Sequence, residues 1–293
     1  MSHPNHAELL RSMLNQRRLV RMPCAYDGLS ARIAQSVGFP VVAFSGNAVS
    51  ASLLGLPDIG VLTLTENLEH AGRIARGLKI PMICDADTGY GGVMNVMRTV
   101  REFEAAGVAG IHIEDQVTPK RCGLLPQGIP VLSEEDTVQK IMAAVHARQD
   151  PNFVIIARTD AKSMHGLKDA AHRANAYAKA GADAVIVMGA NTAEELRYVA
   201  DIAQVPLVVV VQETGPTAEL TDETLESVGC VFALHAGTAR YAVVKALKDS
   251  FQALRQDSHT RSVRDRMATF EEYNQVLGMD EWLELERQFA MKV

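Results

Sequence analysis

The stretch EAAGVAGIHIED, residues 104–115, joins the end of a predicted helix to a predicted strand. Gly107 stands where helices commonly terminate, and the apolar run GIHI follows shortly after it. The same order recurs in AKAGADAVIVMG at 178–189 and in SVGCVFALHA at 227–236. Repetition of helix, glycine and strand indicates parallel strands, because parallel neighbours need a crossover connection.

Short apolar runs alternate with amphipathic runs along the whole chain. We predict strands at 19–25, 41–44, 82–85, 110–114, 153–158, 184–188, 207–211 and 231–234. We predict helices at 30–37, 65–77, 93–106, 134–148, 167–180, 193–203, 222–227 and 238–253. A doubly wound open sheet would also accommodate eight such units. No GxGxxG sequence follows the first strand, and polar residues gather at the ends of several strands, so we predict a closed (β/α)8 barrel of the TIM type.

The predicted domain organisation is a catalytic barrel over residues 1–255 and a helical extension over 256–293. The segment 261–293 is predicted to be extra helix that packs on the barrel or on a partner subunit. Its apolar positions are Phe270, Tyr273, Leu277, Trp282, Leu283 and Phe289.

Composition excludes several classes of protein. The net charge of −6 comes without a basic patch, which argues against a nucleic-acid partner. Four widely spaced cysteines without a CxxC pair suggest neither a disulfide framework nor a structural zinc site. The chain lacks a secretory signal pattern and a run of eighteen apolar residues, so we expect a cytoplasmic protein with no membrane contact.

The stretch PMICDADTGYGG at 81–92 places Asp85 and Asp87 at the end of an apolar strand. Two carboxylates there are unfavourable unless a positive group joins them. If the strand continues through Asp87, the two side chains share a face. Oxygen ligands with water suit Mg²⁺, with Mn²⁺ as an alternative, rather than zinc. The competing interpretation is a loop in which both carboxylates cap backbone N–H groups.

A second acidic strand end, GIHIEDQ at 110–116, supports the metal interpretation. Glu114 and His112 are two residues apart and would both point into the barrel mouth, although His112 can also be a core histidine. Asp58, in the loop LGLPDIG, is a further candidate carboxylate. On its own, Asp58 would be interpreted as a turn residue.

The long Pro- and Gly-rich connection VTPKRCGLLPQGIPV at 117–131 is typical of a lid or binding loop. Cys122 lies in it beside Lys120 and Arg121, and neighbouring cations make a thiol more effective as an acid or nucleophile. The alternative is an ordinary exposed cysteine. No Ser/His/Asp spacing or GxSxG sequence supports a hydrolase triad.

Two more strand ends add polar groups. IIARTDA at 155–161 supplies Arg158, a candidate clamp for a carboxylate. AFSGNAVSASLLG at 43–55 supplies Ser45, Gly46 and Asn47, whose small size lets backbone N–H groups approach an anion. Each signal is weak alone, and their convergence on one face of one barrel is the stronger argument.

Together, SGNAVSASLLGLPD, DADTGYGG, NVMRTVREFEAAGVAGIHIEDQ, PKRCG and ARTDA resemble the isocitrate lyase and phosphoenolpyruvate mutase superfamily, and most closely its methylisocitrate lyase branch. The resemblance covers roughly residues 19–245. It implies a barrel whose extra C-terminal helix swaps between subunits in a homotetramer built from dimers. It also implies Mg²⁺ held by Asp87, with Asp85, Asp58 and Glu114 acting largely through water.

The resemblance further implies a small 2-hydroxy or 2-oxo diacid substrate that reacts through an enolate. Its oxyacid end would contact the metal, Arg158 and the backbone at Ser45 and Gly46. Cys122 would protonate the carbanion of the departing fragment. Completing the candidate set are Lys120 and His112 among catalytic residues, and Asn47 and Gly123 among substrate-binding residues.

The sequence departs from the tricarboxylate-cleaving lyases at four places. Leu124 replaces the histidine of KRCGH, Gly189 replaces a glutamate, Val210 replaces an asparagine, and Ala43, with Phe44 next, replaces an aromatic residue. All four changes remove polar groups from the half of the site that would bind the second fragment. We therefore expect a 2-substituted malate-like substrate and poor use of methylisocitrate.

Several alternatives remain open at this level. Gln212, Glu213 or Gln127 can restore the missing polar groups from neighbouring positions. Beside a Mg²⁺-dependent carbon–carbon lyase that releases a 2-oxo acid such as pyruvate, the scaffold allows four other functions. These are oxaloacetate decarboxylation or hydrolysis, phosphonomutase chemistry of the carboxyphosphonoenolpyruvate type, methylisocitrate cleavage itself, and a non-catalytic binding barrel. The cysteine of PKRCG favours the lyase.

Overall fold

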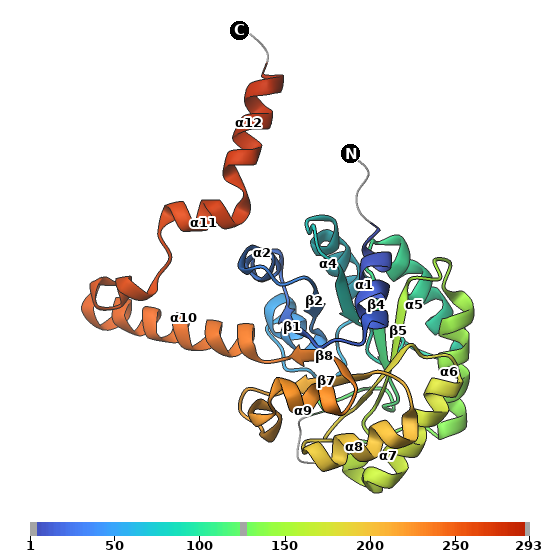
Figure 1. The fold of residues 1–293 in the computed structure, drawn as a ribbon. Coiled ribbons are helices and arrows are strands. Elements are labelled where there is room, and N and C mark those ends of the chain that lie inside the picture. The colour runs from blue at the N-terminus through green and yellow to red at the C-terminus, as the bar shows by residue number, and fades with distance from the viewer. Residues whose placement is uncertain (1–4, 124–127, 291–293) are drawn as a thin grey trace.

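Eight parallel strands close into a barrel in the order of the sequence, in a computed structural model that describes residues 5–123 and 128–290 (Figure 1). The closed (β/α)8 barrel predicted from the sequence is confirmed, and each predicted strand end lies within one residue of the observed one. The strands are β1 Val20–Ala25, β2 Val42–Phe44, β3 Met82–Asp85, β4 Gly110–Glu114, β5 Val154–Thr159, β6 Ala184–Val187, β7 Leu207–Val211 and β8 Cys230–His235.

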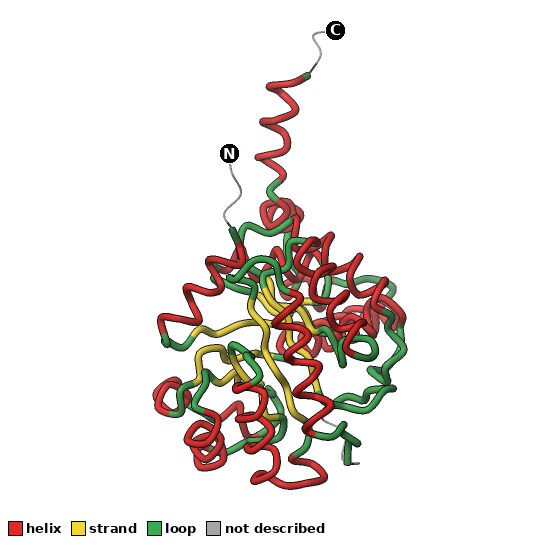
Figure 2. The backbone as a smooth tube through the Cα atoms, turned by 90° about the vertical axis from the view of Figure 1, so that its right-hand side faces the viewer, coloured by secondary structure: helices red, strands yellow, loops and turns green. Residues whose placement is uncertain are grey.

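Helices surround the strands, which leaves the barrel buried on its outer face (Figure 2). All eight predicted helices are present, as α2 Gly28–Val37, α4 Leu64–Arg76, α5 Val93–Ala105, α6 Glu134–Ala147, α7 Lys162–Lys179, α8 Ala193–Ala203, α9 Asp222–Ser227 and α10 Thr238–Asp257. Helix α7 begins earlier than predicted because it contains a kink at Gly166, whose φ is 81°. No helix in the described ranges combines the length and the hydropathy that crossing a membrane requires.

Several short elements were not predicted. Strand β2 is followed directly by α3 Gly46–Val49 and a π-helical turn, η1 Ser50–Leu54. A 3₁₀ turn, η2 Pro216–Glu219, separates β7 from α9. These elements sit in connections where the sequence carries no 3.6-residue apolar repeat of useful length.

The N-terminal helix α1, His6–Gln16, was also not predicted, and it packs against one end of the barrel. Its Leu10 and Leu14 side chains are buried in the cluster that includes Phe232 of β8. Arg11 of α1 pairs with Asp183, which immediately precedes β6, at 2.6 Å between Nη1 and Oδ1. The N-terminal end of a (β/α)8 barrel generally contributes stability rather than chemistry, and this helix fits that pattern.

The C-terminal region forms an arm that leaves the barrel along α10 (Figure 1). The region predicted as extra helix is helical and is divided into η3 Arg261–Arg266, α11 Phe270–Leu277 and α12 Met279–Phe289. Gly278 separates the last two helices with a φ of 76°. The proposed domain boundary after residue 255 stays a prediction, and α10 runs across it.

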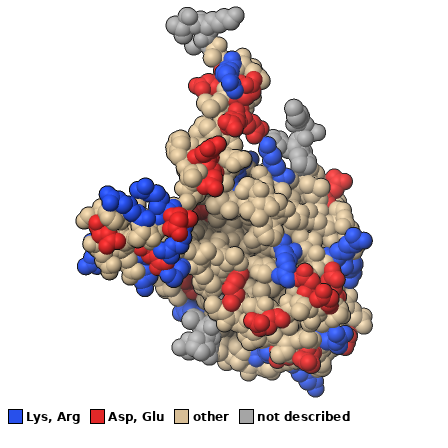
Figure 3. Space-filling view, turned by 60° about the vertical axis from the view of Figure 1, so that its left-hand side comes forward, with Lys and Arg blue, Asp and Glu red and all other residues tan. Residues whose placement is uncertain are grey.

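The arm touches the barrel through α11, where Arg32 Nη2 of α2 donates to the carbonyl of Leu277 at 2.7 Å. Phe270, Trp282 and Phe289 are 82%, 68% and 78% exposed. On the face drawn in Figure 3, charges of both signs are intermixed on the arm, and the neighbouring barrel surface is mainly neutral. The arm therefore carries large apolar side chains that this chain does not cover.

Replacing Asp183 with alanine should lower the free energy of unfolding by about 1–3 kcal/mol, because it removes the shared partner of two half-buried arginines. Asp183 accepts from Arg11, from Arg148 Nη1 at 2.8 Å and from the backbone N–H of Ile155 at 2.8 Å. Urea unfolding followed by circular dichroism measures the effect. Exposed Asp201 on α8 gives the matched control, and Asp201→Ala should stay within about 0.5 kcal/mol of the parent. Equal unfolding midpoints for the two variants would contradict this account.

Candidate active site

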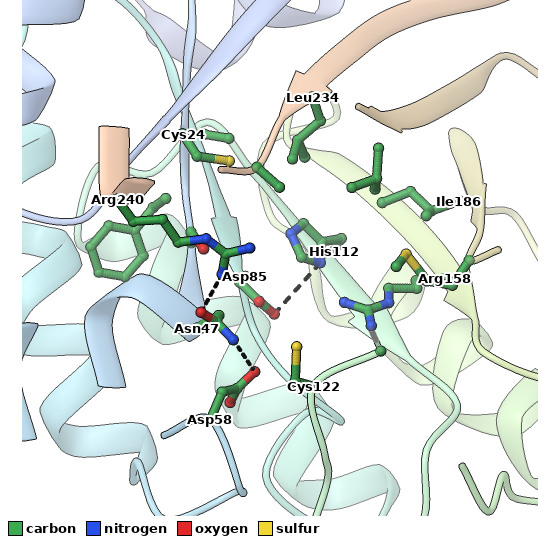
Figure 4. A pocket seen from close by; sticks show the side chains of 17 residues that line it. Cys24, Asn47, Asp58, Asp85, His112, Cys122, Arg158, Ile186, Leu234 and Arg240 are labelled. Atoms are coloured by element: carbon green, nitrogen blue, oxygen red, sulfur yellow. Dashed lines mark hydrogen bonds and ion pairs between the residues drawn. The ribbon is translucent and has the colours of Figure 1, made fainter. Parts of the chain in front are cut away.

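Polar side chains from β2 to β5 converge on a cavity at the carboxyl end of the barrel (Figure 4). Parallel strands of a closed barrel all end on this face, which is why residues from distant parts of the sequence meet there. Of the predicted site residues, those that line the cavity are Ser45, Asn47, Asp58, Asp85, His112, Cys122, Gly123 and Arg158. The other predicted residues, Gly46, Asp87, Glu114 and Lys120, lie against these lining residues.

Asp85 and Asp87 come together by a turn, not by a shared strand face. Strand β3 ends at Asp85, and Asp87 has a φ of 47°, a left-handed conformation that aspartate tolerates better than most residues. Asp85 Oδ1 accepts from the backbone N–H of Asp87 at 3.0 Å. The capping alternative is therefore correct for Asp85, while both side chains remain buried at the barrel end.

The Lys120 ammonium group lies among the predicted metal-binding carboxylates. Its Nζ is 2.6 Å from Asp58 Oδ1 and 2.8 Å from Asp87 Oδ1. Burial alone would lower the pKa of Lys120, but Asp87, Asp85, Glu114 and Asp58 together raise it well above its usual value. The lysine is charged and ties the segment that carries Cys122 to the acidic cluster.

The pKa values of these acids move in opposite directions. Burial raises the pKa of Asp87 to about 7, with Lys120 opposing the change and Asp85 adding to it. Burial also raises the pKa of Glu114 well above its usual value, although Arg158 opposes it. Burial works against charge on Asp85 too, but His112, Lys120 and Arg158 outweigh it and lower its pKa to about 2. The cluster therefore holds more carboxylates than its cations keep ionised.

His112 faces the cavity, as the first of its two interpretations predicted. Its Nδ1 lies 3.6 Å from Asp85 Oδ1, which is too long for a hydrogen bond. Burial lowers the pKa of His112, although Asp85 opposes the change. The imidazole can donate or accept a hydrogen bond at the centre of the site.

The segment 119–123 closes one side of the cavity, with the Cys122 thiol pointing inward (Figure 4). The backbone N–H of Cys122 donates to the carbonyl of Asp58 at 3.2 Å. Both cations that neighbour Cys122 in the sequence have partners other than the thiol. Lys120 reaches the acidic cluster, and Arg121 Nη1 donates to the carbonyls of Ile59, Pro119 and Lys120.

The backbone donors predicted at Ser45 and Gly46 are engaged within the protein. The N–H of Ser45 donates to the carbonyl of Ala25 at 3.1 Å, and that of Gly46 to Asp85 Oδ2 at 3.3 Å. A Cβ on Gly46 would lie 2.8 Å from that oxygen, so only glycine fits there without displacing the carboxylate. Gly46 thus supports Asp85 directly.

Sequence reasoning missed Arg240, which enters the cavity from the first turn of α10 (Figure 4). Its Nη1 donates to Asn47 Oδ1, and Asn47 Nδ2 makes a long contact of 3.5 Å with Asp58 Oδ2. Arg240 lies 193 residues from Asn47 and outside the recognised motifs, so no local pattern marked it.

The rest of the cavity wall is apolar. This wall is formed by Ile186 of β6, Met188 just after β6, Val210 of β7 and Leu234 of β8. It lies opposite the polar strands β2 to β5. Two of the noted departures, Ala43 and Val210, line the cavity. Gly189 does not line this cavity, and its carbonyl accepts a hydrogen bond from Lys162. Leu124 lies outside the described residues.

The residues offered as substitutes for the lost polar groups do not reach this wall. Glu213 accepts from the backbone N–H of Gly237 at 2.9 Å and from the Thr238 hydroxyl. Gln212 lines a separate pocket beside β6 and β7. Gln127 lies outside the described residues. Among the residues that the structure describes, the β6–β8 wall therefore remains apolar.

The donor chemistry suits a hard cation. Within residues 5–123 and 128–290, no group of three His, Cys, Asp or Glu side chains is spaced to hold a metal ion directly. Mg²⁺, however, commonly binds through one or two carboxylates and keeps several waters. Glu114 Oε1 is buried without a hydrogen-bond partner, and the acids outnumber Lys120 and Arg158. A cation bound through one carboxylate and water fits this set of residues.

A family model described as phosphoenolpyruvate phosphomutase matches residues 10–255. The chain belongs to this family. A curated 2,3-dimethylmalate lyase from Eubacterium barkeri is 39% identical over 98% of this chain and 99% of its own. A 2-methylisocitrate lyase from Halalkalibacterium halodurans is 36% identical over 98% of this chain and 94% of its own. The family resemblance inferred from the sequence is confirmed.

Solved structures of family relatives cover nearly the whole chain. An oxaloacetate acetylhydrolase bound to 3,3-difluorooxalacetate matches with a TM-score of 0.92, 31% identity and complete coverage of both chains. A 2,3-dimethylmalate lyase, described as a PEP mutase/isocitrate lyase superfamily member, gives 0.90 and 34%, covering 98% of this chain and 96% of its own. A phosphonopyruvate hydrolase with oxalate and Mg²⁺ gives 0.87 and 31%, covering 98% and 100%. The chain is therefore an enzyme of this superfamily.

Gly46→Ala should lower the free energy of unfolding by about 1–3 kcal/mol, because the new Cβ collides with the buried Asp85 carboxylate. Gly28→Ala is the matched control: a Cβ at Gly28 meets nothing within 4 Å. Thermal unfolding of both variants measures the difference. Equal melting temperatures would show that Asp85 moves aside without cost and is not held by Gly46.

Proposed function

We propose that this enzyme is a Mg²⁺-dependent carbon–carbon lyase that cleaves a 2-substituted malate-like acid and releases a 2-oxo acid such as pyruvate. The observation that carries the proposal is the division of the cavity wall. One half, from β2 to β5, presents His112, Asp85 and Arg158, and the other, from β6 to β8, presents aliphatic side chains. A substrate with an oxyacid head and an alkyl-bearing distal part matches both halves.

The surplus of negative charge in the cluster supports a metal cofactor. Asp58, Asp85, Asp87, Glu114 and Asp160 lie around the Lys120 and Arg158 cations. Burial raises the pKa values of Asp87 and Glu114, and Lys120 and Arg158 do not offset it. We propose that Asp87 holds Mg²⁺, with Asp85, Asp58 and Glu114 acting largely through water. When bound, the ion would stabilise negative charge on the substrate's 2-oxygen and on one carboxylate oxygen.

The protein's own residues then have separate roles. Arg158 holds the carboxylate next to the hydroxyl-bearing carbon. As the hydroxyl proton is given up to solvent, the bond from that carbon to its neighbour breaks, and the carbon becomes a ketone. The electron pair stays on the neighbouring carbon, which takes a proton from the Cys122 thiol. Ile186, Val210 and Leu234 exclude water from the distal fragment, and the thiol is reprotonated from solvent.

The apolar wall also bears on substrate choice within the family. A second fragment with two carboxylates, as in methylisocitrate, would leave one without a partner on β6–β8. The 39% identity to a 2,3-dimethylmalate lyase supports a smaller distal part with alkyl groups. Pyruvate release from a panel of 2-alkylmalates, 2,3-dialkylmalates and methylisocitrate, followed with lactate dehydrogenase, tests this choice.

A second candidate is hydrolysis of an oxaloacetate-like 2-oxo diacid. It is favoured by the structural match to an oxaloacetate acetylhydrolase, at a TM-score of 0.92. This reaction would need the acidic and Arg158 half of the cavity but leaves the aliphatic wall without a role. For this reason we place it second.

We also propose that the arm packs against a second copy of the chain in a homotetramer. Exposed Phe270, Trp282 and Phe289 support this assembly, because apolar residues of this size in one segment usually need a partner surface. A cytoplasmic location stays a prediction from the sequence.

Cys122→Ser should reduce lyase turnover by about 10²–10⁴-fold, the usual contribution of a positioned general acid, because a serine hydroxyl is a much weaker acid. Binding of oxalate should change little. The assay compares pyruvate release and oxalate affinity for the two proteins. Cys230→Ser, at a buried cysteine outside the cavity, controls for loss of a thiol as such. Nearly unchanged turnover in Cys122→Ser would instead favour the hydrolase.

Removal of divalent ions should abolish turnover, and added Mg²⁺ should restore it, because the acidic cluster lacks positive charge. Isothermal titration calorimetry should show Mg²⁺ binding to the parent and a loss of at least about tenfold in affinity for Asp87→Asn. Asp201→Asn should bind Mg²⁺ like the parent. Full activity in the presence of excess chelator would disprove the metal proposal.

A further inference from the structure

The Asp160 carboxylate accepts two hydrogen bonds from the Arg158 guanidinium. The carboxylate is buried, with Oδ2 2.9 Å from Arg158 Nε and Oδ1 2.9 Å from Nη2. Such two-point contacts along one edge fix the plane of a guanidinium group as well as its position. No other hydrogen bond to the Asp160 carboxylate is formed within the described part of the chain.

This contact determines which donors of Arg158 are free. The edge formed by Nε and Nη2 faces Asp160, while Nη1 lies 2.9 Å from Glu114 Oε2 in an ion pair. Arg158 lines the cavity, and the end-on edge of its guanidinium, formed by Nη1 and Nη2, is not the edge that Asp160 contacts. Two parallel N–H groups on that edge match the two oxygens of one carboxylate.

The backbone at Gly123 covers the Arg158–Asp160 pair closely. A Cβ on Gly123 would lie 2.6 Å from Asp160 Oδ1 and 2.7 Å from Arg158 Nη2. The pair therefore also sets how near the Cys122 segment can come to the bound substrate.

The backbone of Asp160 is in turn hydrogen-bonded to the side chain of Asp115, which directly follows β4. Asp115 Oδ1 accepts from the Asp160 backbone N–H at 2.9 Å, and Oδ2 accepts from the Thr159 hydroxyl at 2.6 Å and from the Tyr177 hydroxyl at 2.9 Å. Asp115 is not among the residues that line the cavity, and it supports the turn after β5.

The Asp160 carboxylate beside Arg158 is unfavourable for anion binding on electrostatic grounds. Its charge repels an incoming carboxylate, so it weakens binding unless the geometry that it imposes is worth more. We propose that Asp160 is a positioning residue that aims the Nη1–Nη2 edge of Arg158 at a substrate carboxylate. The inference rests on the proposed function, in which Arg158 binds that group.

If Asp160 mainly repels the substrate carboxylate, its removal should tighten oxalate binding. If Asp160 mainly positions Arg158, its removal should weaken oxalate binding. With Asp160→Ala, loss of positioning should raise the Kd for oxalate in the presence of Mg²⁺ and the KM of the substrate by about 10–100-fold, with kcat changed much less. Asp160→Asn retains one acceptor oxygen and should give an intermediate Kd. Calorimetry with oxalate needs no turnover and is the deciding measurement.

Asp169→Ala provides the control, because Asp169 Oδ2 accepts from Arg173 Nε at 2.8 Å in a similar pair on α7, outside the cavity. It should bind oxalate like the parent. Unchanged or tighter oxalate binding by Asp160→Ala overturns the inference, since only a repelling charge would then have been removed. Should that variant fail to fold, parent-like affinity in Asp160→Asn overturns it equally. A parent enzyme that binds no oxalate with Mg²⁺ contradicts the proposed function instead.

Discussion

The carboxyl end of the barrel gathers five buried carboxylates around two cationic side chains, and the rest of the site is arranged to tolerate that imbalance. Asp58 and Asp87 share the Lys120 ammonium, while Glu114 and Asp160 share the Arg158 guanidinium. Buried acids without enough counter-charge shift their pKa values upward, as Asp87 and Glu114 do. Burying these carboxylates destabilises the fold. Such clusters are typical of functional sites, where a bound cation or a reacting group uses their negative charge.

The two halves of the barrel contribute different chemistry to the cavity. Strands β3 to β5 present Asp85, His112 and Arg158 to the cavity, whereas β6 to β8 present aliphatic side chains to it. Charge develops at one end of the proposed substrate, and the other end needs shape and exclusion of water. A barrel supports this division because each strand end can change without altering the packed interior of its neighbours.

Arginine and lysine are used differently in this site. Lys120 offers a compact charge at the end of a flexible chain, which can reach Asp58 and Asp87 from a loop. Arg158 stands on a strand and is clamped on one edge, so its remaining donors point in a fixed direction. The first cation ties the Cys122 segment to the acidic cluster, and the second presents its donors in a fixed direction.

The sequence alone determined the barrel and the residues that surround its mouth. The helix–glycine–strand repeat specifies parallel strands, and strand-end residues such as Asp85, Glu114 and Arg158 must then share one rim. Tertiary structure alone decided how these residues act. The turn at Asp87, the reach of Lys120, the entry of Arg240 from α10 and the division of the arm at Gly278 depend on segments that are distant in the sequence. Periodicity reports which face of an element is buried, but the direction of a charged side chain depends on the partners that the closed barrel brings within reach.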